Sequence, residues 1–364
     1  MSSISVNTIT DASGGATTSI NGFTPTVSNM AGRNRIINGD MRIAQRGTGP
    51  IAAVSQTYLV DRWNAAGFNG ASCTIEQSTE APANFTRSLK YTVTTGATTD
   101  PTDYNDVRQY VEGLNVADFG WGTVNAKTVT LSFWVRSSLT GTFAVAFVNG
   151  TYARCYPASY TINSANTWEY KTVTVAGDTS GTWVTDTSTG LRVVFDLGVG
   201  SDYSSALNQW SSGVLFGGTG ATKLSATTGA TFYITGVQLE AGAVATPFEH
   251  RQYGTELALC QRYFQSRVGY NVVMGSRYST NLLFFSYALP VVMRTTPSVS
   301  NASGWSALNT TASEQSAAST LNTVITSTGG NVDVVINSSF NPASYIYFID
   351  HYSTSVPTLF SAEL

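Results

Sequence analysis

The stretch Thr128-Val-Thr-Leu-Ser-Phe-Trp-Val135 indicates the fold most clearly. In an extended backbone Leu131, Phe133 and Val135 point to one side, and the residues between them point to the other, because side chains alternate along a strand. This period of two is typical of a strand with one buried face. The stretch therefore predicts a half-buried β-strand.

Similar runs recur between residues 34 and 249, with Gly, Asn and Asp between them. They are Ser72–Gln77, Ser88–Val93, Gly141–Val148, Glu169–Val175, Gly190–Leu197 and Thr231–Leu239. Many short strands without helical periods between them are typical of sandwiches and barrels. Residues 34–249 are therefore predicted to form an all-β domain, a jelly-roll β-sandwich.

Residues 1–33 differ from this body in composition. They are rich in Ser, Thr, Asn and Gly, with a few isolated apolar residues. Such a segment cannot bury enough apolar surface to build a core of its own. It is predicted to be an extended arm, either a disordered tail or an arm that orders by strand pairing on a partner.

A helix and a small domain are predicted after the sandwich. Apolar residues recur at helical spacing from Tyr253 to Val268, which predicts a linker helix within 250–269. Residues 270–364 are predicted to form a small C-terminal β domain with strands near 281–287, 331–337 and 344–350. The Ser/Thr/Ala-rich stretch 301–327 is predicted to be a loop.

The charge of the chain limits its partners. Charged residues make up only 11%, and the formal net charge is −3, whereas about 25% of an ordinary soluble domain is charged. No broad basic field is available for nucleic acid. The chain also lacks the run of about 18 apolar residues that spans a membrane, and Met1–Thr10 lacks the features of a secretory signal. Neither nucleic-acid binding nor membrane insertion is expected.

Histidine and cysteine are too few for several kinds of chemistry. The chain has only two histidines, so neither a Ser-His-Asp catalytic triad nor a His-rich metal site is expected. Cys73, Cys155 and Cys260 are too widely spaced for a zinc motif and are expected to be free, buried thiols. No catalytic residue, metal or cofactor is predicted.

Sugars are held by flat aromatic rings and planar hydrogen-bonding groups, so aromatic residues in loops are the candidates for glycan binding. Aromatic residues make up 12% of the chain, and most of them are expected in the core. The stretch 178–210 places aromatics in loop-like polar sequence, where recognition commonly resides. The predicted glycan-binding residues are Trp183, Asp186, Tyr203, Asn208 and Trp210.

Glycan cleavage is a less favoured alternative, because it would need two carboxylates at a set separation. Two groups of acidic residues could supply them. They are Asp100, Asp103, Asp106 and Glu112, and Asp178, Asp186, Asp196 and Asp202. Short acidic loops more often form turns, so the chain is expected not to be an enzyme.

Three segments together resemble tail-fibre and adhesin-type virion proteins of tailed bacteriophages. They are Asn34–Gly47 with Tyr58–Asn64, Leu131–Ser137, and Ile234–Glu249 continuing into Tyr253–Phe264; Val6–Gly14 and, more loosely, Pro290–Pro297 add to them. The resemblance implies a carbohydrate-binding-module-like jelly roll and a homotrimer in the virion. It also implies that residues 1–33 bind other virion proteins of the tail hub or capsid. The chain would then bind host-surface glycans, or alternatively serve as a capsid decoration, head fibre or tail component without a receptor.

Two further expectations concern charged residues near the ends of the sandwich. Arg62 and Glu240 are expected to form a structural ion pair at its edge. The resemblance also implies a structural calcium ion, for which Asp61 and Glu240 would be the candidates. Calcium takes six to eight oxygen ligands, so these two carboxylates fall short and no metal site is predicted.

Overall fold

The computed structural model describes residues 32–68, 70–267, 273–279, 282–300, 305–309, 315–317, 320–322, 331–337, 346–351 and 358–364. The chain divides into two units, Met1–Arg251 and Gln252–Leu364. Residues 1–31 of the predicted arm lie outside the described residues. Gly32 and Arg33, assigned to the arm, contact the sandwich through Glu249 and Pro247.

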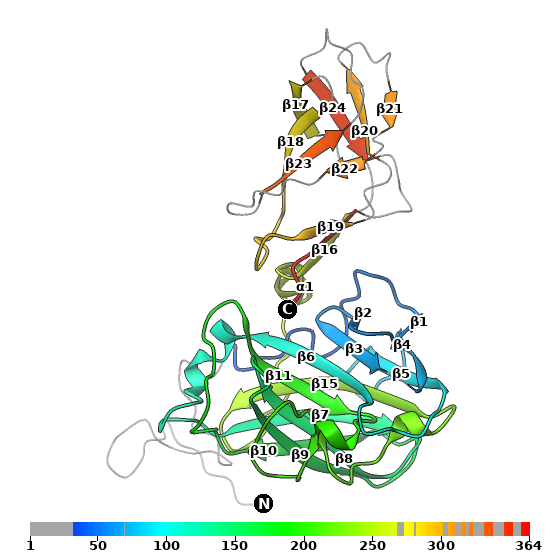
Figure 1. The fold of residues 1–364 in the computed structure, drawn as a ribbon, viewed down its shortest axis with the longest axis vertical. Coiled ribbons are helices and arrows are strands. Elements are labelled where there is room, and N and C mark those ends of the chain that lie inside the picture. The colour runs from blue at the N-terminus through cyan, green and yellow to red at the C-terminus, as the bar shows by residue number, and fades with distance from the viewer. Residues whose placement is uncertain are drawn as a thin grey trace, which may run out of the picture. The chain divides into compact units, whose positions relative to one another are not determined.

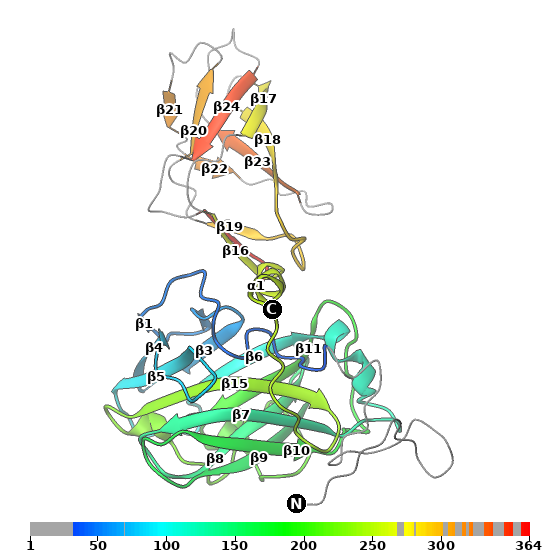
Figure 2. The same ribbon diagram turned by 180° about the vertical axis from the view of Figure 1, so that it is seen from behind.

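The first unit is a sandwich of two antiparallel sheets (Figures 1 and 2). The six-stranded sheet has the order β1 (Ile51–Ala52), β4 (Ser72–Ser78), β5 (Ser88–Thr95), β15 (Thr231–Ala241), β7 (Val129–Ser137) and β10 (Glu169–Val175). The seven-stranded sheet has the order β13 (Ser211–Ser212), β9 (Arg154–Ile162), β8 (Gly141–Asn149), β11 (Thr189–Asp196), β6 (Tyr104–Glu112), β3 (Trp63–Phe68) and β2 (Thr57–Tyr58). The predicted all-β sandwich is confirmed.

Short elements complete this unit. They are the parallel pair β12 (Ser204–Ser205) and β14 (Gly217–Gly218), and four 3-10 turns, η1 (Gly113–Asn115), η2 (Ala117–Phe119), η3 (Ser201–Tyr203) and η4 (Leu224–Ala226). The segment from η3 to β14 passes beside the seven-stranded sheet and contributes to the site described below.

The core lies between the two sheets, as the opening stretch predicts. Leu131, Phe133 and Val135 are fully buried. The ring of Phe133 on β7 meets that of Phe195 on β11 edge-on, at 5.2 Å between centroids, and so joins the two sheets. Burying a Phe or Leu side chain contributes roughly 1.5–3 kcal/mol, so this layer is the main source of stability.

Strand β15 is irregular near its middle. Its register on β7 shifts between Thr235 and Gln238, and Gly236 adopts a φ of 62°. A Cβ at this glycine would lie 2.7 Å from the Phe85 ring. Only glycine fits both the left-handed backbone and the close approach, so the strand forms a bulge here.

Two sequence expectations are wrong in the second unit. The helix α1 spans Tyr253–Gln261 and does not reach 268, because Phe264–Arg267 forms β16, pairs with β25 (Thr358–Ser361) and buries Phe264. β25 also pairs with β19 (Ser298–Ser300). The region 301–327, predicted as a loop, contains three short strands, of which two form the edges of a sheet and the third pairs beside one edge.

That sheet is a seven-stranded one and contains the three strands predicted for this domain. Its order is β21 (Gln315–Ala317), β20 (Trp305–Asn309), β24 (Ile346–His351), β17 (Val273–Ser279), β18 (Leu282–Ala288), β23 (Asn331–Asn337) and β22 (Thr320–Asn322). Among the described residues, no helix has the length and apolar character needed to cross a membrane.

Candidate functional site

The side chains of strand β6 alternate between the core and the outer face of the seven-stranded sheet. Val107 and Val111 point into the core, and Gln109 on the same side bonds to the backbone of Ile37. Tyr104, Asp106 and Arg108 lie on this outer face. In a sheet with one solvated face this face would be exposed, yet Asp106 and Arg108 are at most 4% exposed.

Asp106 and Arg108 form a buried ion pair. Nε of Arg108 donates to Oδ1 of Asp106 at 2.6 Å, and Nη2 donates to the second carboxylate oxygen. Burial raises the pKa of Asp106, and the adjacent guanidinium offsets this only in part. Burial lowers the pKa of Arg108, but the carboxylate prevails and raises it overall, so the guanidinium stays charged.

Aromatic rings surround this guanidinium. The rings of Tyr203 and Phe216 stack at 4.9 Å with an interplanar angle of 19°, and Tyr104 meets Phe216 edge-on at 5.3 Å. The central carbon of the Arg108 guanidinium lies 5.4 Å from the centroid of Phe216. Such cation–π contacts hold the flat guanidinium against the rings.

These side chains enclose a pocket of about 230 Å³, here called the Arg108 pocket. It is lined by Gln56, Ala66, Tyr104, Arg108, Tyr152, Tyr203, Val214 and Phe216. Apolar and aromatic walls around a few polar groups are the usual composition of a small-molecule site. The volume is small, suited to about one sugar ring at a time.

Tyr152 forms one wall in a strained conformation. Its φ is 58°, and a bulky residue in this region costs about 1–3 kcal/mol. Its ring stacks on the guanidinium of Arg192, with 3.7 Å from the guanidinium carbon to the ring centroid. Nη1 of Arg192 donates to the carbonyl of Asn149 at 2.5 Å, and burial lowers the pKa of Arg192. The strain persists because these contacts fix the turn between β8 and β9.

Several polar atoms beside the pocket lack hydrogen bonds. Asn64 on β3 pairs in register with Arg108 and is fully buried. Its Oδ1 and Nδ2, and Nε of Arg192, have no partner within the described parts of the chain. More than nine-tenths of buried polar groups are paired in proteins, so these unpaired atoms are unusual, although others occur elsewhere in the sandwich, for example at Tyr160 and Thr235.

The five residues predicted for glycan binding do not lie together. Tyr203 lines the Arg108 pocket. Asn208 bonds to Ser159, and the Asp186 carboxylate accepts from the backbone N–H of Ser188 in a turn.

Trp183 and Trp210 form a separate group with Trp121, here called the Trp cluster. Their ring centroids are 4.7 Å (Trp121–Trp183), 5.4 Å (Trp121–Trp210) and 5.8 Å (Trp183–Trp210) apart. The indole nitrogens of Trp183 and Trp210 donate to the carbonyls of Ser180 and Ala176. Both rings are half-buried against the core, and their role in glycan binding stays a prediction.

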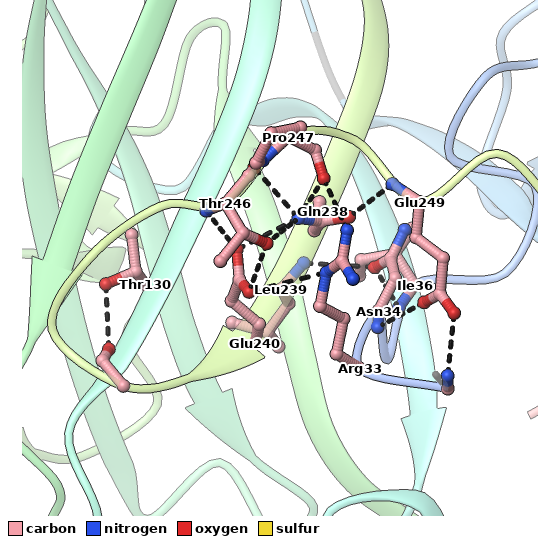
Figure 3. A network of polar contacts seen from close by, with 12 residues as sticks. Arg33, Asn34, Ile36, Thr130, Gln238, Leu239, Glu240, Thr246, Pro247 and Glu249 are labelled. Atoms are coloured by element: carbon pink, nitrogen blue, oxygen red, sulfur yellow. Dashed lines mark hydrogen bonds and ion pairs between the residues drawn. The ribbon is translucent and has the colours of Figure 1, made fainter. Parts of the chain in front are cut away.

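A second buried polar group, the β15 cluster, joins the start and the end of the sandwich (Figure 3). It comprises Asn34, Gln238, Glu240, Thr246 and Glu249. Glu240 accepts from the backbone and hydroxyl of Thr246 at 2.8 and 2.7 Å and from Gln238 at 2.9 Å. Glu249 accepts from the backbone of Asn34 at 2.9 Å, and Oδ1 of Asn34 accepts from the backbone N–H of Leu239 at 3.1 Å.

The β15 cluster corrects the expected Arg62–Glu240 pair. Glu240 faces Arg33 at 3.8 Å, while Arg62 donates to the carbonyl of Tyr110. Arg62 adopts a φ of 71° and turns toward β6, which the pattern of the sequence does not reveal.

Several of the carboxylates considered for calcium or catalysis are engaged in structural bonds. Asp61 accepts from the backbone and side chain of Gln45, so like Glu240 it is surrounded by donors, which does not fit a calcium site. Among the described residues, no group of three or more His, Cys, Asp or Glu could hold a metal ion. Asp178 pairs with Arg154 at 2.7 Å, and Asp196 accepts from three backbone N–H groups. The three cysteines are free and buried, as predicted.

No protein-family model and no curated protein matches this sequence. Among solved structures, the chain is similar to a candidate sugar-binding protein from Bacteroides thetaiotaomicron, at 12% identity and a TM-score of 0.34, over 57% of this chain and 100% of that one. It is similar to a family 11 carbohydrate-binding module of a Clostridium thermocellum cellulosomal cellulase, at 13% identity and a TM-score of 0.29, over 57% and 98% of the two chains. It is also similar to the xylan-binding domain CBM22-1 from Paenibacillus barcinonensis, at 10% identity and a TM-score of 0.25, over 55% of this chain and 98% of that one. Because each TM-score lies below 0.5, we base the functional assignment on the pocket itself.

Proposed function

We propose that this chain is a non-catalytic glycan-binding protein and that the Arg108 pocket holds the sugar. The observation that carries this proposal is the pocket's combination of stacked aromatic rings with a buried guanidinium. Aromatic faces bind the apolar side of a sugar ring, and guanidinium, amide and phenol groups bind its hydroxyls. The unpaired amide of Asn64 supports the same reading.

We further propose that the protein is part of a bacteriophage virion, as a tail fibre or adhesin. The support is the resemblance of the quoted segments. Two of them, Asn34–Gly47 and Ile234–Glu249, are far apart in the sequence and meet in the β15 cluster. In this proposal residues 1–33 bind other virion proteins, and the chain acts as a homotrimer.

Attachment would then be multivalent. A pocket that holds about one ring makes few contacts and binds weakly alone. Several copies on one particle raise the effective concentration of each further site, which gains roughly 10²–10⁴ in avidity. Light scattering of the purified protein tests the trimer, and a monomer mass would exclude it.

The glycan pocket is tested by removing its stacked rings. Tyr203→Ala and Phe216→Ala should each weaken binding to host-surface glycan about tenfold, since one aromatic contact contributes roughly 1–1.5 kcal/mol. Tyr170→Ala is the matched control, because Tyr170 is an exposed aromatic on the six-stranded sheet. Equal binding by folded pocket variants and the control would overturn the proposal.

A further inference from the structure

The charges around the Arg108 pocket do not balance. β3, β6 and β11 lie side by side in the seven-stranded sheet, and the register places their outward side chains in rows. With Arg62 before β3 and Lys223 facing Asp196 at 3.5 Å, this face carries four cations and three carboxylates. They are Arg62, Arg108, Arg192 and Lys223, and Asp106, Glu112 and Asp196.

The excess positive charge can be located. The carboxylate of Asp106 is bound to Arg108, and that of Asp196 faces Lys223. Among the described residues, Arg192 has no acidic partner; its guanidinium is held by the Tyr152 ring, the more distant Tyr110 ring and one carbonyl. Its Nε is buried without a hydrogen bond.

An isolated buried cation is costly, and proteins compensate such charges by pairing them. Arg192 gains cation–π attraction, roughly 2 kcal/mol in a desolvated setting, the Asn149 carbonyl and an interaction with the Tyr110 side chain, all of them neutral groups. Arg108 has a third guanidinium nitrogen, Nη1, beyond the two that bind Asp106, and it lines the pocket. A ligand anion in the pocket would meet Arg108 directly and would lie in the field of Arg192, which is covered by the pocket wall Tyr152.

We infer that the Arg108 pocket recognises an anionic sugar, one that carries a carboxylate or a phosphate group. This inference rests on the proposed function and specifies its ligand. Guanidinium groups bind carboxylate and phosphate through strong charge-assisted hydrogen bonds. The aromatic walls hold the sugar ring, and the positive charge selects the acid over its neutral relative.

The experiment compares matched probes on a glycan array. Each set contains a hexuronate oligosaccharide, its uncharged methyl ester, the corresponding neutral hexose oligosaccharide and a phosphodiester-linked form. We expect the acidic members to bind about tenfold or more tightly than the ester, and only acid binding to weaken as salt rises. The uronate and phosphate arms identify which anion is bound.

Variants locate the effect. Arg192→Gln should remove most of the preference for acid over ester and retain binding of the ester through the rings. Arg87→Gln removes one positive charge elsewhere and should leave the preference unchanged. Arg192→Lys keeps the charge and should keep part of the preference for acid over ester. It still provides a result if Arg192→Gln does not fold.

The outcomes separate the two proposals. Equal binding of acid and ester by the native protein, abolished by Tyr203→Ala, overturns the inference and leaves the proposed function standing. A preference that persists in folded Arg192→Gln also overturns the inference. Binding to no member of any set, or binding insensitive to Tyr203→Ala, counts against both.

Discussion

The β15 cluster and the Arg108 pocket both bury polar and charged side chains, yet they differ in hydrogen bonding. In the β15 cluster every side-chain oxygen and nitrogen of Asn34, Gln238, Glu240 and Glu249 has a partner. Beside the pocket, both amide atoms of Asn64 and one nitrogen of Arg192 have none among the described residues. The difference separates polar groups whose hydrogen bonds stabilise the fold from buried polar groups that lie behind the pocket wall without such bonds.

The reason lies in the cost of unmade bonds. A buried polar group that keeps its partners contributes roughly 0.5–1.5 kcal/mol, whereas one without a partner costs about 1–3 kcal/mol. Removing a group that has its hydrogen bonds should therefore lower stability. Replacing a group that lacks them by an apolar side chain should raise stability and weaken function.

The largest effect is expected in the β15 cluster. Glu240→Ala leaves the backbone and hydroxyl of Thr246 without their acceptor and removes the anion facing Arg33. The free energy of unfolding of the sandwich should fall by about 3 kcal/mol, measured by urea denaturation. Glu76→Ala is the matched control, because Glu76 pairs with Lys90 at the surface and should cost less than about 1 kcal/mol. A loss for Glu240 no larger than that for Glu76 would show that the cluster does not fasten the fold.

The Trp cluster provides the next test, because its half-buried rings could belong to either class. Replacing Trp183 and Trp210 together by alanine should lower the free energy of unfolding by about 2 kcal/mol or more, since both rings pack against the core. Adsorption to host cells, measured well below the melting temperature, then tests their predicted role in glycan binding. Unchanged adsorption would assign the cluster to structure alone.

Asn64→Leu should have the opposite sign. The leucine has a similar volume and removes two unpaired buried polar atoms, so the free energy of unfolding should rise by about 1 kcal/mol. Glycan binding should weaken, because the row that contains Arg108 loses an amide. The same urea titration and the glycan array measure both effects. A destabilised protein would mean that the Asn64 amide has a structural partner after all.

The sequence predicted the fold better than the site, for a physical reason. Strands such as Val129–Ser137 have an apolar face and a polar one, and their period of two is visible. Strand β6 places Tyr104, Asp106 and Arg108 on a face that is buried too. Because polar and charged residues occur throughout this strand, its sequence lacks the usual alternation and resembles an acidic loop that forms turns. The strand that carries the site was therefore not predicted.

Tyr203 was the only predicted binding residue that lines the pocket. Its partners Tyr104, Tyr152 and Phe216 lie about 100, 50 and 13 residues away along the chain. The tertiary fold of the sheet and the loops beside it brings them together. The alternation of Tyr, Asp and Arg over Tyr104–Tyr110 was the one local signal available. Cross-strand pairing such as Asn64 with Arg108 has no local signature at all.

The smallest effect concerns Glu169, a carboxylate near the surface that has all its hydrogen bonds. It extends the comparison from buried groups with and without partners to a group with partners near the surface. Glu169 accepts from Lys171, from the backbone N–H of Ser164, and from the side chain and backbone N–H of Asn163, at 2.5–2.9 Å. Partial burial opposes its ionisation, but these bonds outweigh burial and lower the pKa to about 2. Because the pKa is lower in the folded than in the unfolded chain, Glu169 stabilises the fold above its unfolded pKa of about 4.3. That contribution is lost as the pH falls from about 4 toward 2.

Solvent screening limits this contribution to about 1 kcal/mol. The substitution Glu169→Gln should therefore lower the free energy of unfolding by that amount at pH 7 and by little at pH 2, measured by urea titration. A cost that does not diminish at low pH would mean that these bonds hold the turn between β9 and β10 by shape and not by charge.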